Sequence, residues 1–151
     1  MSDVGPGVRL PPPVVVAGAL ALAWLLGWLV PWRIGPPAPL FAGVLVLAAL
    51  FWLGWALLLM RRAGTDPRPF RPDTAMVLGG PFRFGRNPIY LGFVGIMAGL
   101  ALAWATPWAW LAVMGVFLWL DRFVIRREEA YLTARFGGEY TAYAARVRRW
   151  L

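Results

Sequence analysis

The sequence predicts an all-α fold: a polytopic membrane bundle of about four transmembrane helices with a cytoplasmic C-terminal helical extension, in a single domain over residues 1–151. Apolar residues make up 60% of the chain, against about 45–50% in a typical soluble domain. Ten tryptophans in so short a chain are typical of the aromatic belts at membrane surfaces. Four apolar runs are long enough, or nearly so, to cross a bilayer. They cover residues 14–30, 40–60, 89–105 and 107–125.

The first two runs are separated by a proline-rich turn, residues 31–39. Val14–Val30 holds 17 uncharged residues, which as a helix would reach about 26 Å. A signal peptide is the competing interpretation, but Pro31-Trp32-Arg33 does not resemble a small-residue cleavage site. We therefore expect a membrane span here, followed by a second and clearer span over residues 40–60.

The third and fourth runs follow a polar loop, residues 61–88, that is rich in arginine and proline. Thr106-Pro107 combines a favourable N-cap with proline at the first helical position, so it predicts the start of the fourth helix. Asp121 marks the point at which this helix leaves the membrane, yet nothing breaks the helix before Gly137-Gly138. We therefore expect it to continue into water, followed by a short amphipathic segment, residues 139–151, at the membrane surface.

The distribution of arginine orients the bundle. Residues 61–86 carry six arginines, residues 122–149 carry seven, and the turn at residues 106–107 carries none. Because arginine-rich loops stay in the cytoplasm, the loop 61–88, the tail 126–151 and both termini are predicted to be cytoplasmic. The lysine-free, arginine-rich composition favours a bacterial protein, and hence the bacterial cytoplasmic (inner) membrane.

The composition excludes several kinds of site. The chain has neither cysteine nor histidine, which removes thiolate nucleophiles, histidine-based triads and the commonest transition-metal ligands, so we expect no metal. The formal charge of +8 would suit nucleic acid. However, the arginines flank apolar runs and form no soluble basic surface, so we expect no nucleic-acid partner. Gly79–Gly85 lacks the lysine and the spacing of a nucleotide-binding loop.

Two polar blocks, predicted to lie on the same face of the membrane, form the candidate site. The first is the segment Gly80–Gly92, and the second is Arg126–Tyr140. Each block also has an ordinary explanation. Asn87 can cap a helix that begins at Pro88, and the pair Glu128-Glu129 can form surface ion pairs worth under about 1 kcal/mol each.

Counting along a regular helix gives the expected faces of the second block. Asp121 and Glu128, seven residues apart, share one face. Arg122, Arg126 and Glu129 share another at spacings of four and three. Polar groups at a membrane boundary are costly to desolvate, so a cluster of them indicates function.

The two blocks also match a spaced motif. Its residues are Gly80-Pro81-Phe82, Arg86-Asn87-Pro88-x-Tyr90-x-Gly92, Glu128-Glu129-x-x-Leu132, Phe136-Gly137, Tyr140, Tyr143, Val147 and Trp150. This pattern resembles the isoprenylcysteine carboxyl methyltransferase and phospholipid methyltransferase superfamily. The resemblance covers about residues 60–151, including Gly64-Thr65. Members of that superfamily are integral membrane enzymes that take a methyl group from S-adenosylmethionine.

The resemblance implies S-adenosylmethionine as the cofactor and assigns the residues that contact it. Those residues are Thr74, Ala75, Met76, Val77, Phe82, Asn87, Pro88, Ile89, Tyr90 and Glu128. Physical chemistry is compatible with this assignment, because a helix N-terminus at Pro88 offers N–H groups to a carboxylate. Aromatic rings can cover the sulfonium by cation–π contact.

Methyl transfer needs alignment and desolvation more than an acid–base pair, so no catalytic residue is assigned with certainty. Glu129 and Tyr90 are the candidates where an amine acceptor must lose a proton. Asn87 stands where the prenylcysteine enzymes have histidine, and Val124 stands where the eukaryotic enzymes have a substrate-binding arginine. The candidate replacements for that arginine are Arg122 and Arg126.

The sequence thus predicts methyl transfer from S-adenosylmethionine to a lipophilic or amphiphilic acceptor at the boundary between membrane and cytoplasm. The acceptor would be an isoprenoid or cysteine carboxylate, an aminophospholipid or a small thiol. The expected partners are this lipophilic substrate and the membrane lipids, and no oligomeric state is predicted. The alternative is a non-catalytic membrane accessory or scaffold protein that retains the methyltransferase fold, with Asn87 and Val124 as signs of lost activity.

Overall fold

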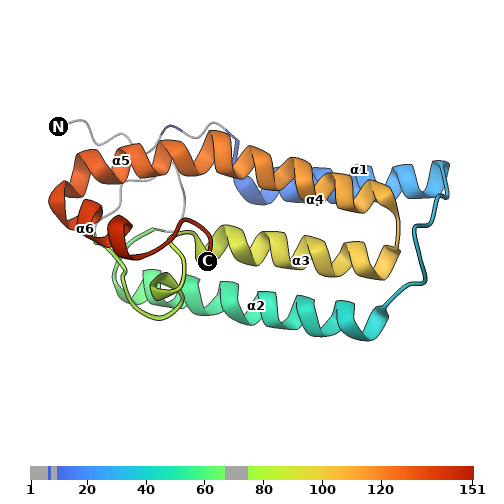
Figure 1. Ribbon diagram of the computed structural model, residues 1–151, viewed down its shortest axis with the longest axis horizontal. Coiled ribbons are helices and arrows are strands. Elements are labelled where there is room, and N and C mark those ends of the chain that lie inside the picture. Colours follow the sequence, from blue (N-terminus) through green and yellow to red (C-terminus); the bar gives the residue numbers. More distant parts are fainter. Residues whose placement is uncertain (1–6, 8–9, 67–74) are drawn as a thin grey trace.

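The computed structural model describes residues 7, 10–66 and 75–151, and every regular element within them is helical. In chain order these are α1 (Pro12–Leu29), α2 (Pro39–Arg62), the 3-10 helix η1 (Gly80–Arg83), α3 (Pro88–Trp104), α4 (Pro107–Trp119), the π-helix η2 (Leu120–Ile125), α5 (Arg126–Phe136) and α6 (Gly138–Arg146). Helices α1 to α4 run up and down, with α2 along α3 and α4 along both α1 and α3 (Figure 1). The predicted all-α fold class is confirmed.

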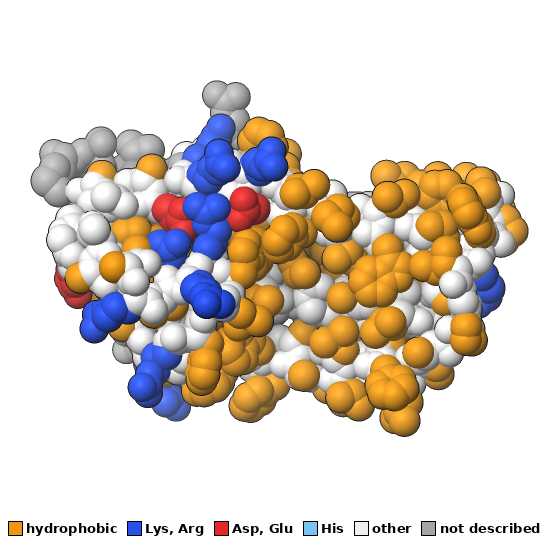
Figure 2. All heavy atoms as spheres, in the orientation of Figure 1, with side chains coloured by type: hydrophobic (Ala, Val, Ile, Leu, Met, Phe, Trp, Pro, Cys, Tyr) orange, Lys and Arg blue, Asp and Glu red, His pale blue; other side chains and the backbone are white. Residues whose placement is uncertain are grey.

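The described residues hold three helices that are long and apolar enough to cross a membrane. They are Pro12–Leu29, Pro39–Arg62 and Pro107–Phe136, and α3 is a shorter apolar helix beside them. Large apolar side chains stand outward, as Trp28 does with 71% of its surface exposed. Figure 2 shows these side chains spread over most of the bundle, whereas nearly all the arginine and acidic side chains in view gather at one end. An apolar surface of this extent is suited to lipid rather than to water.

Small residues let α3 approach α2 closely. Gly92, Gly95 and Gly99 all face α2, and a Cβ atom added to Gly99 would lie 2.5 Å from Val46 Cγ2 and 3.0 Å from the Ala42 carbonyl oxygen. Close approach of this kind is a main source of helix association in a membrane, where the hydrophobic effect between helices is weak. The close contact with α2 therefore fixes the position of α3, including its N-terminal end.

The long fourth helix begins and ends as predicted. Thr106 accepts a hydrogen bond at its Oγ1 atom from the Ala109 amide (3.4 Å), and Pro107 occupies the first turn. Between α4 and α5 the helix widens into the π-turn η2 without breaking, so that it continues to Phe136. Gly137 then adopts a φ of +55°, which ends α5.

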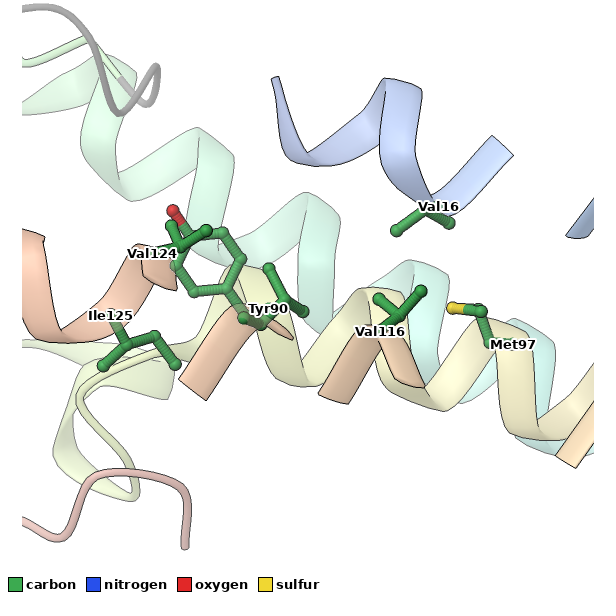
Figure 3. Close-up of a cluster of buried hydrophobic side chains, with 7 residues drawn as sticks. Val16, Tyr90, Met97, Val116, Val124 and Ile125 are labelled. Carbon is green, nitrogen blue, oxygen red and sulfur yellow. The ribbon is translucent and has the colours of Figure 1, made fainter. Parts of the chain in front are cut away.

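A buried apolar cluster connects the membrane helices to the charged end. It joins Val16 of α1, Met97 of α3, Val116 of α4 and Val124 of η2, and Tyr90 lies among them (Figure 3). Tyr90 is only 6% exposed. Because its ring is held by packing, the direction in which its hydroxyl points is set by the core.

Residues 139–151 differ from the single amphipathic segment that the sequence suggests. Tyr140 and Tyr143 of α6 are buried in the protein, and Val147 is extended, with φ −117° and ψ 130°. Beyond it the chain returns toward the start of α3, where the Arg86 amide donates to the Arg148 carbonyl oxygen (2.9 Å; Figure 1). Helical counting therefore fails after Arg146, because the helix has already ended.

Candidate functional site

An open cavity lies at the charged end of the bundle, between the end of α2, the segment before α3, and helices α5 and α6. Thr74 lies outside the described residues. Every other predicted cofactor-binding residue lines this cavity: Ala75, Met76, Val77, Phe82, Asn87, Pro88, Ile89, Tyr90 and Glu128. The two polar blocks of the sequence, some 40 residues apart, thus meet in one cavity.

The end of α2 forms one wall. Gly64 adopts a φ of +71° and donates to the Arg61 carbonyl oxygen (3.1 Å), while the Thr65 amide donates to the Met60 carbonyl oxygen (3.1 Å). These two bonds form a Schellman motif, which turns the chain sharply at a residue without a Cβ. The turn brings Thr65 and Asp66 to the cavity wall.

Tyr90 and Glu128 connect the two sides of the cavity. The Tyr90 hydroxyl donates to Glu128 Oε1 at 2.5 Å, from the first turn of α3 to the first turn of α5. A hydrogen bond to a carboxylate is shorter and stronger than one between neutral groups. This bond sets the position of the Glu128 carboxylate within the cavity.

Asn87 occupies the N-cap position of α3 but does not act as the side-chain cap that we expected. Its Nδ2 atom donates instead to the Arg149 carbonyl oxygen (2.9 Å). Asn87, Pro88 and Ile89 all line the cavity, so the N-terminal end of α3 faces it. The first-turn amides and the helix dipole make this end of the cavity favourable for an anionic group.

Glu129 has surroundings very different from those of its neighbour. Arg149 binds both of its carboxylate oxygens, with Nε at 3.1 Å and Nη2 at 2.6 Å, and Arg86 Nη2 lies 3.1 Å from Oε1. Arg149 also reaches Asp121, at 3.3 Å and 3.5 Å from its two oxygens. The hydrogen bond and charge of Glu129, followed by those of Asp121, hold the pKa of Arg149 above its usual value against partial burial.

The π-turn explains why Asp121 and Glu129 share a cation. In a regular α-helix, residues eight apart would point about 80° apart around the axis. The extra residue that a π-turn accommodates brings them close to the same side. Regular counting paired Asp121 with Glu128, and this pairing is wrong because the helix is not regular over Leu120–Ile125.

Two buried tyrosines of α6 close the cavity. Tyr143 donates from its hydroxyl to the Phe82 carbonyl oxygen (2.6 Å). Burial, and then the neighbouring Tyr140, raise the pKa of Tyr143 to about 12. The pKa of Tyr140 is also raised, chiefly by burial and then by Glu129, although Arg86 opposes the shift through its charge and a hydrogen bond. Both phenols are therefore neutral at ordinary pH.

The structure separates some predicted residues from the cavity and adds others. Arg122 and Arg126 are exposed and do not line it, and their assignment to a substrate stays a prediction. Glu129 and Tyr90 do line it. The lining residues to which sequence reasoning gave no role are Met60, Thr65, Asp66, Arg86, Leu132, Tyr140 and Tyr143. Most of them were in the quoted motif, but nothing in the sequence indicated which of them face inward.

Comparison with known proteins agrees with this geometry. The family model for phospholipid methyltransferases matches residues 38–139, about two-thirds of the chain. The chain belongs to the phospholipid methyltransferase family. The match begins beside α2 and ends in α6, so it includes the first polar block, the second as far as Glu139, and every cavity-lining residue except Tyr140 and Tyr143.

A relative from Haemophilus influenzae, an uncharacterized protein, is 41% identical over 63 residues, which cover 42% of this chain and 100% of the relative. No solved structure matches. The phospholipid methyltransferase family lies within the isoprenylcysteine carboxyl methyltransferase-like superfamily of membrane methyltransferases, so the resemblance is confirmed. With its apolar helices, the chain is an integral membrane protein of a methyltransferase family whose substrates are lipid-like.

Proposed function

We propose that the protein transfers a methyl group from S-adenosylmethionine to an amphiphilic acceptor whose apolar part stays in the bilayer. The observation that carries this proposal is the pairing of Tyr90 with Glu128 beside the open N-terminal end of α3, within one cavity. The cavity thus offers an anionic group and an anion-binding helix end a short distance apart. A zwitterionic ligand needs both.

The cavity suits S-adenosylmethionine in its chemistry, because polar and aromatic side chains line it together. Arg86 lines the cavity, and its buried Nε atom has no hydrogen-bond partner among the described residues, which leaves a donor for a ligand. Buried donors are seldom left unpaired in a folded protein.

Each part of the cavity suits a part of the ligand. The α3 N-terminus would take its carboxylate, Glu128 would accept hydrogen bonds from an amine or a ribose, and rings such as Phe82 would cover the adenine and sulfonium. S-adenosylmethionine supplies an electrophilic methyl group whose bond to sulfur breaks as the acceptor attacks. The protein residues align the two molecules and exclude water, which is the main requirement of this displacement.

An amine acceptor would also have to lose a proton. Both oxygens of Glu129 are held by guanidinium groups, so this residue is poorly placed to accept it. Tyr90 is the better candidate, because its phenol oxygen would take the proton from the amine while its own proton passes along the hydrogen bond to Glu128.

Calorimetric titration of the purified protein with S-adenosylmethionine tests the proposal. We expect micromolar binding in the wild type and a loss of about tenfold or more in Glu128→Gln, since a charged hydrogen-bond partner is removed. Glu139→Gln, which changes an exposed carboxylate on α6, is the matched control and should bind like the wild type. Absence of binding in the wild type would leave the non-catalytic accessory protein as the better interpretation. If the wild type does bind S-adenosylmethionine, transfer of labelled methyl groups into lipid extracts would identify the class of acceptor.

A further inference from the structure

The segment 147–151 makes three kinds of contact with the rest of the protein, and the first two involve residues that line the cavity. Its backbone accepts two hydrogen bonds: the Arg86 amide donates to the Arg148 carbonyl oxygen (2.9 Å), and Asn87 Nδ2 donates to the Arg149 carbonyl oxygen (2.9 Å). These bonds hold the two residues that immediately precede α3. The segment thus fixes the loop that forms the anion-binding end of the cavity.

The second contact is electrostatic. Arg149 forms a two-pronged pair with Glu129 and reaches Asp121 as well, so it connects α5 with η2. Glu129 also pairs with Arg86, which lines the cavity. Removal of Arg149 would leave Glu129 paired with Arg86 alone, so the position of the Arg86 guanidinium at the cavity would depend on that one pair.

The third contact is aromatic and steric. The Trp150 ring stacks on Phe117 of α4 with centroids 4.6 Å apart, and its Nε1 donates to Asp121 (3.0 Å). The backbone there lies so close to Gly85 that a Cβ atom on Gly85 would be 1.7 Å from the Trp150 carbonyl oxygen. Only glycine at position 85 permits this approach. The segment therefore packs against α4 on one side and against the loop before α3 on the other.

We propose that the segment 147–151 is a clasp that sets the shape of the cofactor cavity, and that Arg149 is its positioning residue. Arg149 acts through Glu129, Arg86 and Asn87 rather than by touching the ligand, since Arg149 does not line the cavity. As far as it concerns S-adenosylmethionine, the inference rests on the proposed function. Its structural part, the dependence of Arg86 and Asn87 on Arg149, does not.

Two measurements on Arg149 variants test the clasp. In Arg149→Gln we expect affinity for S-adenosylmethionine to fall about tenfold or more, and hydrogen exchange at the Arg86 amide to become about tenfold faster in the ligand-free protein. Arg149→Lys keeps the charge but not the two-pronged geometry, so it should restore part of both quantities. Arg148→Gln is the matched control, because the Arg148 side chain is exposed and only its backbone contacts the site.

A second variant reaches the clasp without any change of charge. Gly85→Ala should displace the segment from the opposite side and produce the same two effects, whereas Gly79→Ala, where an added Cβ would meet nothing within 4 Å, should produce neither. The clasp is refuted if Arg149→Gln exchanges at the Arg86 amide like the wild type. It is also refuted if Arg149→Gln remains folded and binds the ligand like the wild type. Wild-type protein that binds no ligand would refute the proposed function instead, and the exchange result would still decide the clasp.

Discussion

Glu128 and Glu129 are neighbours on one helix, and they illustrate how the surroundings of a side chain determine its role. Glu128 accepts a hydrogen bond from a phenol and lines the cavity, so its carboxylate lies where a ligand can reach it. Glu129 has its charge compensated by two guanidinium groups. An ion pair with only 18% of the Glu129 side chain exposed is screened little by solvent. The first residue is therefore suited to binding and the second to holding elements together.

Burial of Tyr143 makes the free energy of unfolding depend on pH in the alkaline range. Its pKa is raised by burial to about 12, against about 10 in an unfolded chain. Below pH 10 both states keep the phenol proton and the contribution to stability is complete. Between pH 10 and about 12 only the unfolded state releases the proton, so the free energy of unfolding falls by up to about 3 kcal/mol.

Thermal unfolding in detergent across pH 8 to 12 would check this dependence. We expect the melting temperature of the wild type to fall above pH 10, and the fall to be shallower in Tyr143→Phe, which has no proton to release there. The variant also lacks the hydrogen bond to the Phe82 carbonyl oxygen, which lowers its melting temperature at every pH. The comparison is therefore between the two slopes of melting temperature against pH, and not between the melting temperatures at pH 8. Parallel slopes in the two proteins would show that Tyr143 is not the group responsible.

At the scale of elements, the contact between α2 and α3 depends on the absence of side chains. Gly99→Ala would push a Cβ atom to 2.5 Å from Val46 and 3.0 Å from the Ala42 carbonyl oxygen. The backbones must then separate, at a cost of about 1–3 kcal/mol. We expect a lower melting temperature and, because α3 carries Tyr90, weaker ligand binding.

Gly115→Ala on α4 is the control for this change. An added Cβ there meets nothing within 4 Å, so the better helix propensity of alanine should leave stability unchanged or slightly increased. The comparison separates packing from propensity, because both positions are glycines in apolar helices. Equal melting temperatures for the two variants would contradict a close α2–α3 contact.

The helices themselves were predictable, whereas the irregular elements were not. Apolar runs, Thr106-Pro107 and Gly137 gave the helix bounds to within a few residues, since each depends on local chemistry. The π-turn at Leu120–Ile125 contains no proline or glycine that would reveal it, and it moved Asp121 toward Glu129. The return of residues 147–151 depends on contacts with α4 and with the loop before α3, so no local pattern contains it.

The candidate site, like the fold, could be predicted from the sequence only in part. The family resemblance implied that Asn87, Tyr90 and Glu128 would share a site, and the cavity brings them together. Spacing could not show that the Asn87 side chain would bond to the Arg149 backbone, because these residues are 62 positions apart. The importance of Arg149 was hidden for a simpler reason: in the sequence it is one of several arginines near the end of the chain.

At the scale of the whole molecule, the cavity and nearly all the arginines in the described residues lie at one end of the bundle, and only Arg33 lies near the opposite turns (Figure 2). This arrangement agrees with the positive-inside rule. With the orientation predicted from the sequence, the site would open to the cytoplasm. The orientation itself is a prediction that can be tested directly.

The absence of cysteine makes that test straightforward, because single cysteines can be introduced without removing any. Gly35→Cys lies in the turn between α1 and α2, and Ala142→Cys lies on α6 at the cavity end; both positions are exposed. In intact spheroplasts, a membrane-impermeant maleimide should label Gly35→Cys and leave Ala142→Cys unlabelled until the cells are lysed. Labelling of Ala142→Cys alone before lysis would reverse the orientation. The cavity would then face away from the cytoplasmic pool of S-adenosylmethionine, which would also remove the physical basis of the proposed function.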